Sequence, residues 1–133
     1  MTQPLAHLNT RSGSKELVSE HLKLVAARAK EYTTVFNAGK EGYLAGLLHD
    51  LGKYGELFQQ RLRGEINGID HWSAGAWESL QYYKMNGIAA ALAIQGHHIG
   101  LQAANKESLE NINPKKLLVD HPLNLRLSQA DIF

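Results

Sequence analysis

Leucine and other apolar side chains recur three and four positions apart through much of the chain. This is the spacing of one face of an α-helix. The pattern predicts helices over residues 14–32, 40–51, 54–64, 71–85, 87–100 and 123–133, with a loop over 105–114. No stretch of five or more residues alternates convincingly between apolar and polar side chains, so the sequence predicts an all-α fold.

The first two predicted helices carry the clearest apolar stripes. In the first, Ser14 is the expected N-cap, and one face carries Leu17, His21, Leu24, Val25, Arg28 and Tyr32. In the second, one side carries Leu44, Leu47, Leu48 and Leu51. Gly52 follows at the position where a helix end is expected. A helix end allows the adjacent His49 and Asp50 to face one small volume.

The composition is that of a single folded domain over residues 1–133. Hydrophobic residues make up 44% of the chain, and there is no cysteine, which excludes disulfides, thiolate zinc sites and a cysteine nucleophile. The longest apolar run, residues 88–94, is too short to span a bilayer. The N-terminus has no signal-peptide features, so we expect a cytoplasmic protein without membrane contacts.

The charge pattern is not that of a strongly basic nucleic-acid-binding protein, because the formal net charge is only +1. Contact with nucleic acid would depend on local clusters such as residues 61–63 or 113–116. There is no glycine loop of the Walker type, which argues against ATP hydrolysis by this chain alone.

Histidine is the unusual residue type, with seven in 133 residues. Each candidate has an ordinary explanation, such as a buried core histidine for His21 or a salt-bridge carboxylate for Asp50. Together, five histidines and two aspartates at predicted helix ends indicate a metal cluster: His21, His49, Asp50, His71, His97, His98 and Asp131. Imidazole and carboxylate ligands suit Mn, Fe, Ni, Co or Zn, and carboxylates also admit Mg. Two such cations would leave the site positive and able to attract phosphates.

Several motifs occur in a family-specific order. They are HDLGK at 49–53, FQQRL at 58–62, DHWSAGA at 70–76, GHHIG at 96–100 and SQADIF at 128–133. Together they resemble the HD nuclease domain of CRISPR-associated helicase–nucleases from type I systems, within the HD superfamily of metal-dependent phosphohydrolases.

The resemblance implies a compact HD-domain helical bundle with metals in a central groove, and cleavage of single-stranded DNA during CRISPR interference. It implies one ion held by His21, His49, Asp50 and Asp131. A second ion would be held by His71, His97 and His98, with Asp50 bridging the two. Asp50 and Lys53 would be the catalytic residues, Lys53 acting on the phosphate. A CRISPR-associated helicase, in cis or in trans, would supply the single strand and the link to the surveillance complex.

Two other functions stay open at this point. One is an HD phosphohydrolase acting on nucleotides or small phosphoesters, which would need fewer ligands and an enclosed pocket that recognises a base. The other is an inactive domain that docks a helicase or surveillance complex. The chain stops two residues after Asp131, inside a predicted helix, so residues 1–133 are either the whole domain or a fragment truncated at its C-terminus.

Overall fold

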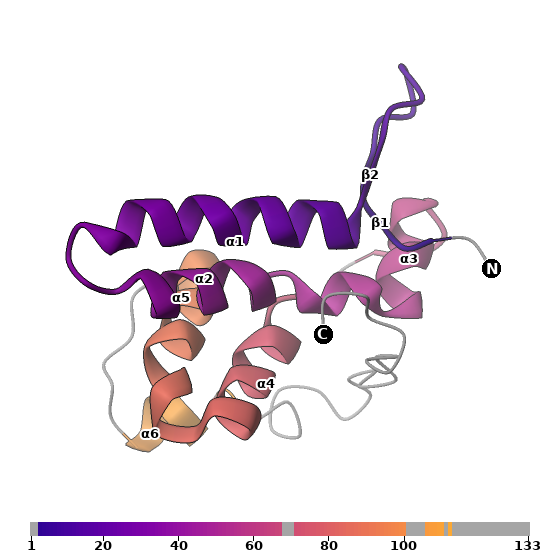
Figure 1. The fold of residues 1–133 in the computed structure, drawn as a ribbon. Helices are drawn as coiled ribbons and strands as arrows, with labels where there is room; N and C mark the ends of the chain where they lie inside the picture. The colour runs from indigo at the N-terminus through magenta and orange to yellow at the C-terminus, as the bar shows by residue number, and fades with distance from the viewer. Residues whose placement is uncertain (1–2, 68–70, 101–105, 111, 113–133) are drawn as a thin grey trace.

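The computed structural model describes residues 3–67, 71–100, 106–110 and 112. Within this part of the chain the fold is mostly helical, as predicted, with one small β-hairpin (Figure 1). The α-helices are α1 (Val18–Thr34), α2 (Gly39–Leu48), α3 (Glu56–Leu62), α4 (Ser73–Tyr83), α5 (Ile88–Ile99) and α6 (Lys106–Glu110). The 3-10 turn η1 (Leu51–Tyr54) lies between α2 and α3, and η2 (Lys84–Gly87) lies between α4 and α5. The strands of the hairpin are β1 (Leu5–Leu8) and β2 (Lys15–Leu17).

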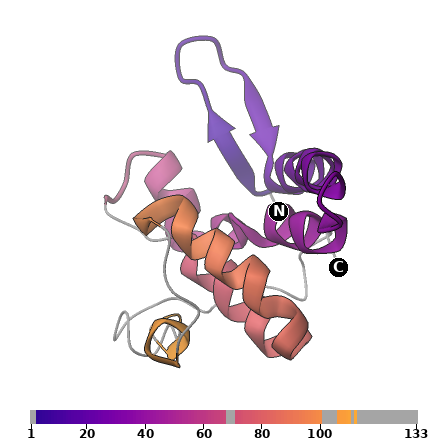
Figure 2. The same cartoon turned by 90° about the vertical axis from the view of Figure 1, so that its left-hand side faces the viewer.

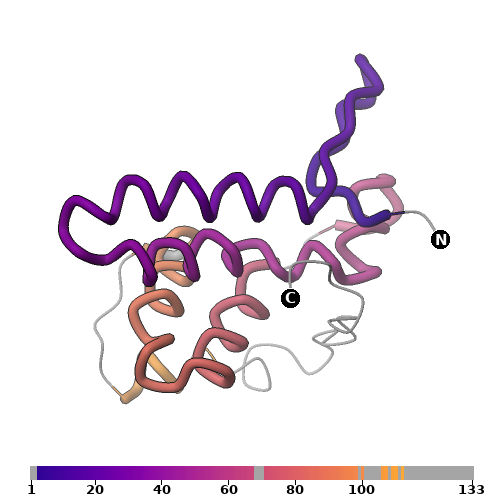
Figure 3. The backbone as a smooth tube through the Cα atoms, viewed as in Figure 1, coloured from indigo at the N-terminus to yellow at the C-terminus, as the bar shows by residue number. Residues whose placement is uncertain are grey.

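Helices α1 and α2 run antiparallel, one along the other, as the backbone tube shows (Figure 3). Their close approach depends on small side chains. A Cβ atom added at Gly46 would lie 2.7 Å from the Cα atom of Ala26, well inside van der Waals contact. Leu22 of α1 and Leu48 of α2 are fully buried beside this contact region. Burial of each such leucine contributes about 2 kcal/mol.

Helix α4 approaches the end of α2 equally closely. A Cβ atom added at Gly75 would collide with the carbonyl group of Leu48, so glycine is what allows this contact. After the 3-10 turn η2, helix α5 folds back along α4 (Figure 2). The packing brings the start of α4 close to the end of α2, where His49 and Asp50 follow.

The hairpin was not predicted, because its strands have only four and three residues. It stands away from the helical body (Figure 1). In its turn, the side-chain oxygen of Asn9 accepts hydrogen bonds from the backbone N–H groups of Arg11 and Ser12, and Gly13 has a φ of +73°. Glycine adopts this left-handed conformation readily, which allows the chain to turn back so that β2 pairs antiparallel with β1.

Several predicted boundaries are wrong. Strand β2 occupies residues 15–17, so α1 starts at Val18 with Leu17, not Ser14, as its N-cap. Leu24 and Tyr32 are 56% and 66% exposed, so they are not on the buried face. A short helix, α6, lies within the predicted loop over 105–114. The predicted helix over 123–133 lies outside the described residues.

The second stripe was predicted correctly, since all four of its leucines are buried. No helix in the described ranges combines the length and apolar character that crossing a membrane requires.

Candidate metal centre

Asp50 lies at the centre of the predicted site and is only 5% exposed. It follows the C-cap of α2, His49. Its Oδ2 atom lies 3.4 Å from His21 Nε2 and 3.2 Å from His49 Nε2. Its Oδ1 atom lies 3.4 Å from His71 Nε2 and 3.9 Å from His98 Nε2. One carboxylate therefore faces two pairs of imidazoles, with one oxygen atom toward each pair.

The spacing of these donor atoms fits metal ligands better than hydrogen bonds. Hydrogen bonds between nitrogen and oxygen have a typical length of about 2.9 Å. Ligands bound at about 2.1 Å in tetrahedral geometry lie about 3.4 Å apart. Asp50 Oδ1 is buried and has no hydrogen-bond partner among the residues that the structure describes, which leaves it free for a cation.

Two groups of three donor atoms follow from this arrangement. One is His21, His49 and Asp50, and the other is Asp50, His71 and His98. Within each group, all three ligand atoms lie within 4.8 Å of one another. The residues present fit one divalent cation in each group, and Asp50 belongs to both.

The backbone fixes the orientation of His49. Its Nδ1 atom lies 2.7 Å from the carbonyl oxygen of Gly46, one turn earlier in α2. A carbonyl oxygen can only accept, so Nδ1 carries a proton, which leaves Nε2 as the nitrogen that can bind a cation. Nε2 faces Asp50 and His21 Nε2, which is 3.3 Å away.

Backbone and ring contacts place the other pair of histidines. The N–H group of Gly52 in η1 donates a hydrogen bond of 3.0 Å to the carbonyl oxygen of His71, two residues before α4. The His71 ring packs edge-on against Phe58 and against His98. His98, near the end of α5, stacks on Trp72. Three separate segments therefore meet at this side of Asp50.

Asp50 is ionised in this setting. Burial raises its pKa, but hydrogen bonding and charge from His49 and Lys53 more than offset that effect. Its pKa lies well below the usual range. The pKa of His21 is lowered by burial, the Lys53 charge and His49, against the opposing effects of Glu16 and Asp50. Both shifts favour the forms that bind cations, a carboxylate and a neutral imidazole.

Lys53 is buried and its Nζ atom lies 3.0 Å from Asp50 Oδ2. The same ammonium lies over the Phe58 ring, 5.5 Å from its centroid. The closest charged partner of Lys53 is thus the Asp50 carboxylate. Its assignment to the phosphate stays a prediction.

His97 belongs to neither group of converging donor atoms within the described ranges. Its ring lies 4.7 Å from the His98 ring and 5.9 Å from the His49 ring, measured between centroids. With His7, His21, His49 and Asp50 it lines a cavity of about 440 Å³. His97 is thus beside the predicted site, and its role as a ligand stays a prediction.

Asp131, predicted as a ligand of the first ion, lies outside the described residues. The sequence reasoning missed Glu16 and gave no role to His7, which also converge on His21. Their proximity depends on the hairpin, in which His7 pairs with Glu16. The turn around Asn9 and Gly13 is the feature of the sequence that brings them together.

Comparisons of the chain with known protein families, with curated proteins and with solved structures find no match. The case for a function therefore depends on the geometry around Asp50 and on the motifs of the sequence.

Proposed function

We propose that the chain is a metal-dependent nuclease of the HD type that hydrolyses phosphodiester bonds of single-stranded DNA. The observation that carries the proposal is the position of Asp50 between two pairs of imidazoles. A pair of divalent cations, when bound, supplies Lewis acidity and a hydroxide nucleophile near neutral pH. Mn, Mg, Ni, Fe and Co are the candidate metals, and the donor set does not single out one of them.

The protein groups have separate tasks in this proposal. Asp50 bridges both groups of donors and keeps its negative charge because its pKa is low. His21 and His49 present Nε2 lone pairs on one side, and His71 and His98 do so on the other. Lys53 balances the carboxylate charge from a buried position. With divalent cations held by these residues, the centre would be positive, which suits the phosphate of a nucleic-acid backbone.

The cavity beside the centre offers few groups for the recognition of a base. Apart from the histidines and Asp50, its lining within the described residues is apolar: Val25, Ala45, Gly46, Ala93 and Ile94. Recognition of a base requires hydrogen-bonding groups at its edge or an aromatic ring against its face. This lining offers neither beyond the metal-site residues and the adjacent histidines.

The choice of single-stranded DNA and a place in CRISPR interference come from the resemblance of the motifs around HDLGK to the helicase–nuclease family. A helicase partner would deliver the unwound strand. This division of labour agrees with the small net charge of the chain. It also agrees with the ion pairs of Arg63, which belongs to the basic cluster at 61–63. Its guanidinium lies 2.9 Å from Glu56 Oε1 and 2.7 Å from Glu65 Oε1, so its charge is neutralised.

The proposal is tested by incubating the protein with circular single-stranded DNA and each candidate metal in turn. We expect linear and shorter products, because an endonuclease needs no free end. Asp50→Ala and the isosteric Asp50→Asn should abolish cleavage, since each removes the shared ligand. Glu41→Ala is the matched control, because it removes an exposed carboxylate from α2, the helix that precedes Asp50. It should leave cleavage unchanged.

Other results would point to the other functions. Hydrolysis of nucleotides or small phosphoesters with intact DNA would contradict the proposed substrate. Full activity of His71→Ala would favour a single ion. No hydrolysis of any substrate with any metal would contradict the enzymatic proposal and favour a docking domain.

A further inference from the structure

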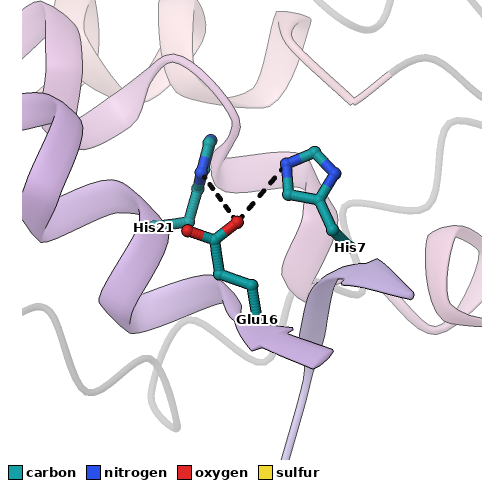
Figure 4. Close-up of side chains that lie close together, drawn as sticks. All are labelled: His7, Glu16 and His21. Atoms are coloured by element: carbon teal, nitrogen blue, oxygen red, sulfur yellow. Dashed lines mark ion pairs between the residues drawn. The ribbon is translucent and has the colours of Figure 1, made fainter. Parts of the chain in front are cut away.

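Three side chains converge at the base of the hairpin, outside the two groups around Asp50 (Figure 4). They are His7 of β1, Glu16 of β2 and His21 of α1. A single carboxylate oxygen, Glu16 Oε2, lies 3.5 Å from His21 Nδ1 and 3.6 Å from His7 Nε2. The opposite nitrogen of His21, Nε2, faces Asp50 and His49.

The chemistry of imidazole decides what Glu16 does here. A neutral histidine has one nitrogen with a lone pair and one N–H group. If Nε2 of His21 binds a cation, Nδ1 carries the proton and can only donate. Glu16 Oε2 is the carboxylate oxygen on that side of the ring. An anionic acceptor at this position fixes the tautomer and raises the basicity of the metal-binding nitrogen.

We propose that Glu16 is a positioning residue that orients His21 for metal binding, so that the hairpin is part of the metal centre. The inference rests on the proposed metal site and extends it to a strand that the sequence motifs do not include. His49 provides an internal precedent, because the Gly46 carbonyl oxygen faces its Nδ1 in the same way. Each imidazole of this pair then has an oxygen behind it and Asp50 in front.

A third cation among His7, Glu16 and His21 is a less favourable reading of the same atoms. It would use Nδ1 of His21 as a ligand while Nε2 serves the first ion, which requires the imidazole to lose both ring protons. The His7 side chain is also 60% exposed, whereas the His21 side chain is 17% exposed.

The hairpin is anchored in a way that suits this role. The side-chain amide of Gln59 accepts from the N–H group of Leu5 and donates to its carbonyl oxygen, both at 3.0 Å. The same amide nitrogen donates to the carbonyl oxygen of Lys53 at 2.7 Å. Gln59 thus connects β1 to the 3-10 turn that contains Lys53. Because His7 of β1 pairs with Glu16 of β2, the same contact also holds β2 in place.

The test measures Mn²⁺ binding by isothermal titration calorimetry, with cleavage not required as a readout. We expect Glu16→Ala to weaken binding of the ion held by His21 and His49 by about 10- to 100-fold, as loss of such an outer partner does. Glu16→Gln should lose much less, because its amide oxygen can still accept from Nδ1. Glu20→Gln is the control, since it removes a charge next to His21 in sequence without removing the contact at Nδ1. It should bind as the wild type does.

A metal-free measurement separates orientation from folding. Long-range ¹H–¹⁵N spectra give the tautomer of each histidine. Asp50 and His49 face Nε2 of His21 while Glu16 faces Nδ1, so we expect both tautomers in the wild type and a smaller fraction with the proton on Nδ1 in Glu16→Ala. The thermal unfolding midpoint of the metal-free protein should be the same in both, because Glu16 is a partly exposed residue of a short strand.

The outcomes are distinct. Equal Mn²⁺ affinity and an unchanged His21 tautomer in Glu16→Ala would overturn the positioning role while leaving the metal centre intact. Loss of one bound ion from three, with the other affinities unchanged, would also overturn it and identify a third cation site. A wild-type protein that binds no divalent cation would overturn the proposed function and this inference together.

Discussion

The two pairs of imidazoles on either side of Asp50 differ in exposure and in their distances from its carboxylate oxygens. Behind His21 and His49, an oxygen atom faces the outer ring nitrogen. His71 and His98 pack against the aromatic rings of Phe58 and Trp72. The side chains of the first pair are 17% and 14% exposed, against 20% and 24% for the second. Their distances to Asp50 are 3.2–3.4 Å and 3.4–3.9 Å, respectively.

We expect unequal metal affinity in the two halves. The shorter distances to Asp50 and the lower exposure, which reduces competition from water, favour the half with His21 and His49. That half should therefore bind its cation more tightly. The half with His71 and His98 should exchange its cation more readily.

The largest expected effect comes from removing one ligand from each half. His49→Ala should weaken the tight ion by more than about 1,000-fold, beyond the range for loss of an outer partner. His98→Ala should leave the tight ion bound and remove only the weaker one. Mn²⁺ titration of both variants measures this. Comparable loss of the tight ion in both variants would show that the two halves are equivalent.

Lys53→Met tests the role of the Lys53 ammonium, which lies beside Asp50 Oδ2 in the half of the site with His21 and His49. Without metal, the variant leaves the buried Asp50 carboxylate without its ammonium partner, which should lower the free energy of unfolding by about 3 kcal/mol. Saturating Mn²⁺ should restore most of that loss, while cleavage stays slower than in the wild type. Urea unfolding with and without Mn²⁺ measures the stability. A loss that Mn²⁺ leaves unchanged would mean that Lys53 stabilises the fold by other contacts.

The smallest effect concerns Glu78 on α4, away from the donor atoms. Burial raises its pKa, so its ionisation disfavours the folded state as the pH rises above the pKa of the unfolded chain, about 4.3. Glu78→Gln should raise the thermal midpoint slightly at pH 7 and leave it unchanged near pH 4. Thermal unfolding at both values measures this. A stabilisation that is equal at the two values would exclude the charge as its cause.

The sequence predicts the helices that bury leucine and the residues that gather at the site. The stripe ending at Leu51 was right because four large side chains on one face leave little choice of orientation. The stripe of α1 was wrong because its contact with α2 uses Ala26 against Gly46. Small residues give a weak signal in an apolar pattern, although they decide how closely two helices pack. The exposed Leu24 and Tyr32 gave a stronger and misleading signal.

The convergence of the histidines on Asp50 was predicted from residue type. The contact of Glu16 with the outer nitrogen of His21 was not predicted. Seven histidines in 133 residues are unusual, and their grouping with aspartates at predicted helix ends indicates a shared ligand role. The convergence of four histidines on Asp50 agrees with that reasoning. Glu16 is a common residue in a partly exposed strand of three, and nothing in its neighbourhood along the chain marks it. Its contact with His21 exists only because a hairpin returns the chain to the start of α1.

The manner in which the hairpin is attached has a practical consequence for protein engineering. One strand is tied down by the Gln59 amide and the other runs directly into α1, so both legs are secured below the turn at residues 9–14. The turn is exposed and closed by its own Asn9 and Gly13. A fluorophore placed there would be held by the hairpin at a fixed position relative to the histidines. Its emission would then report the binding of a cation at the proposed site.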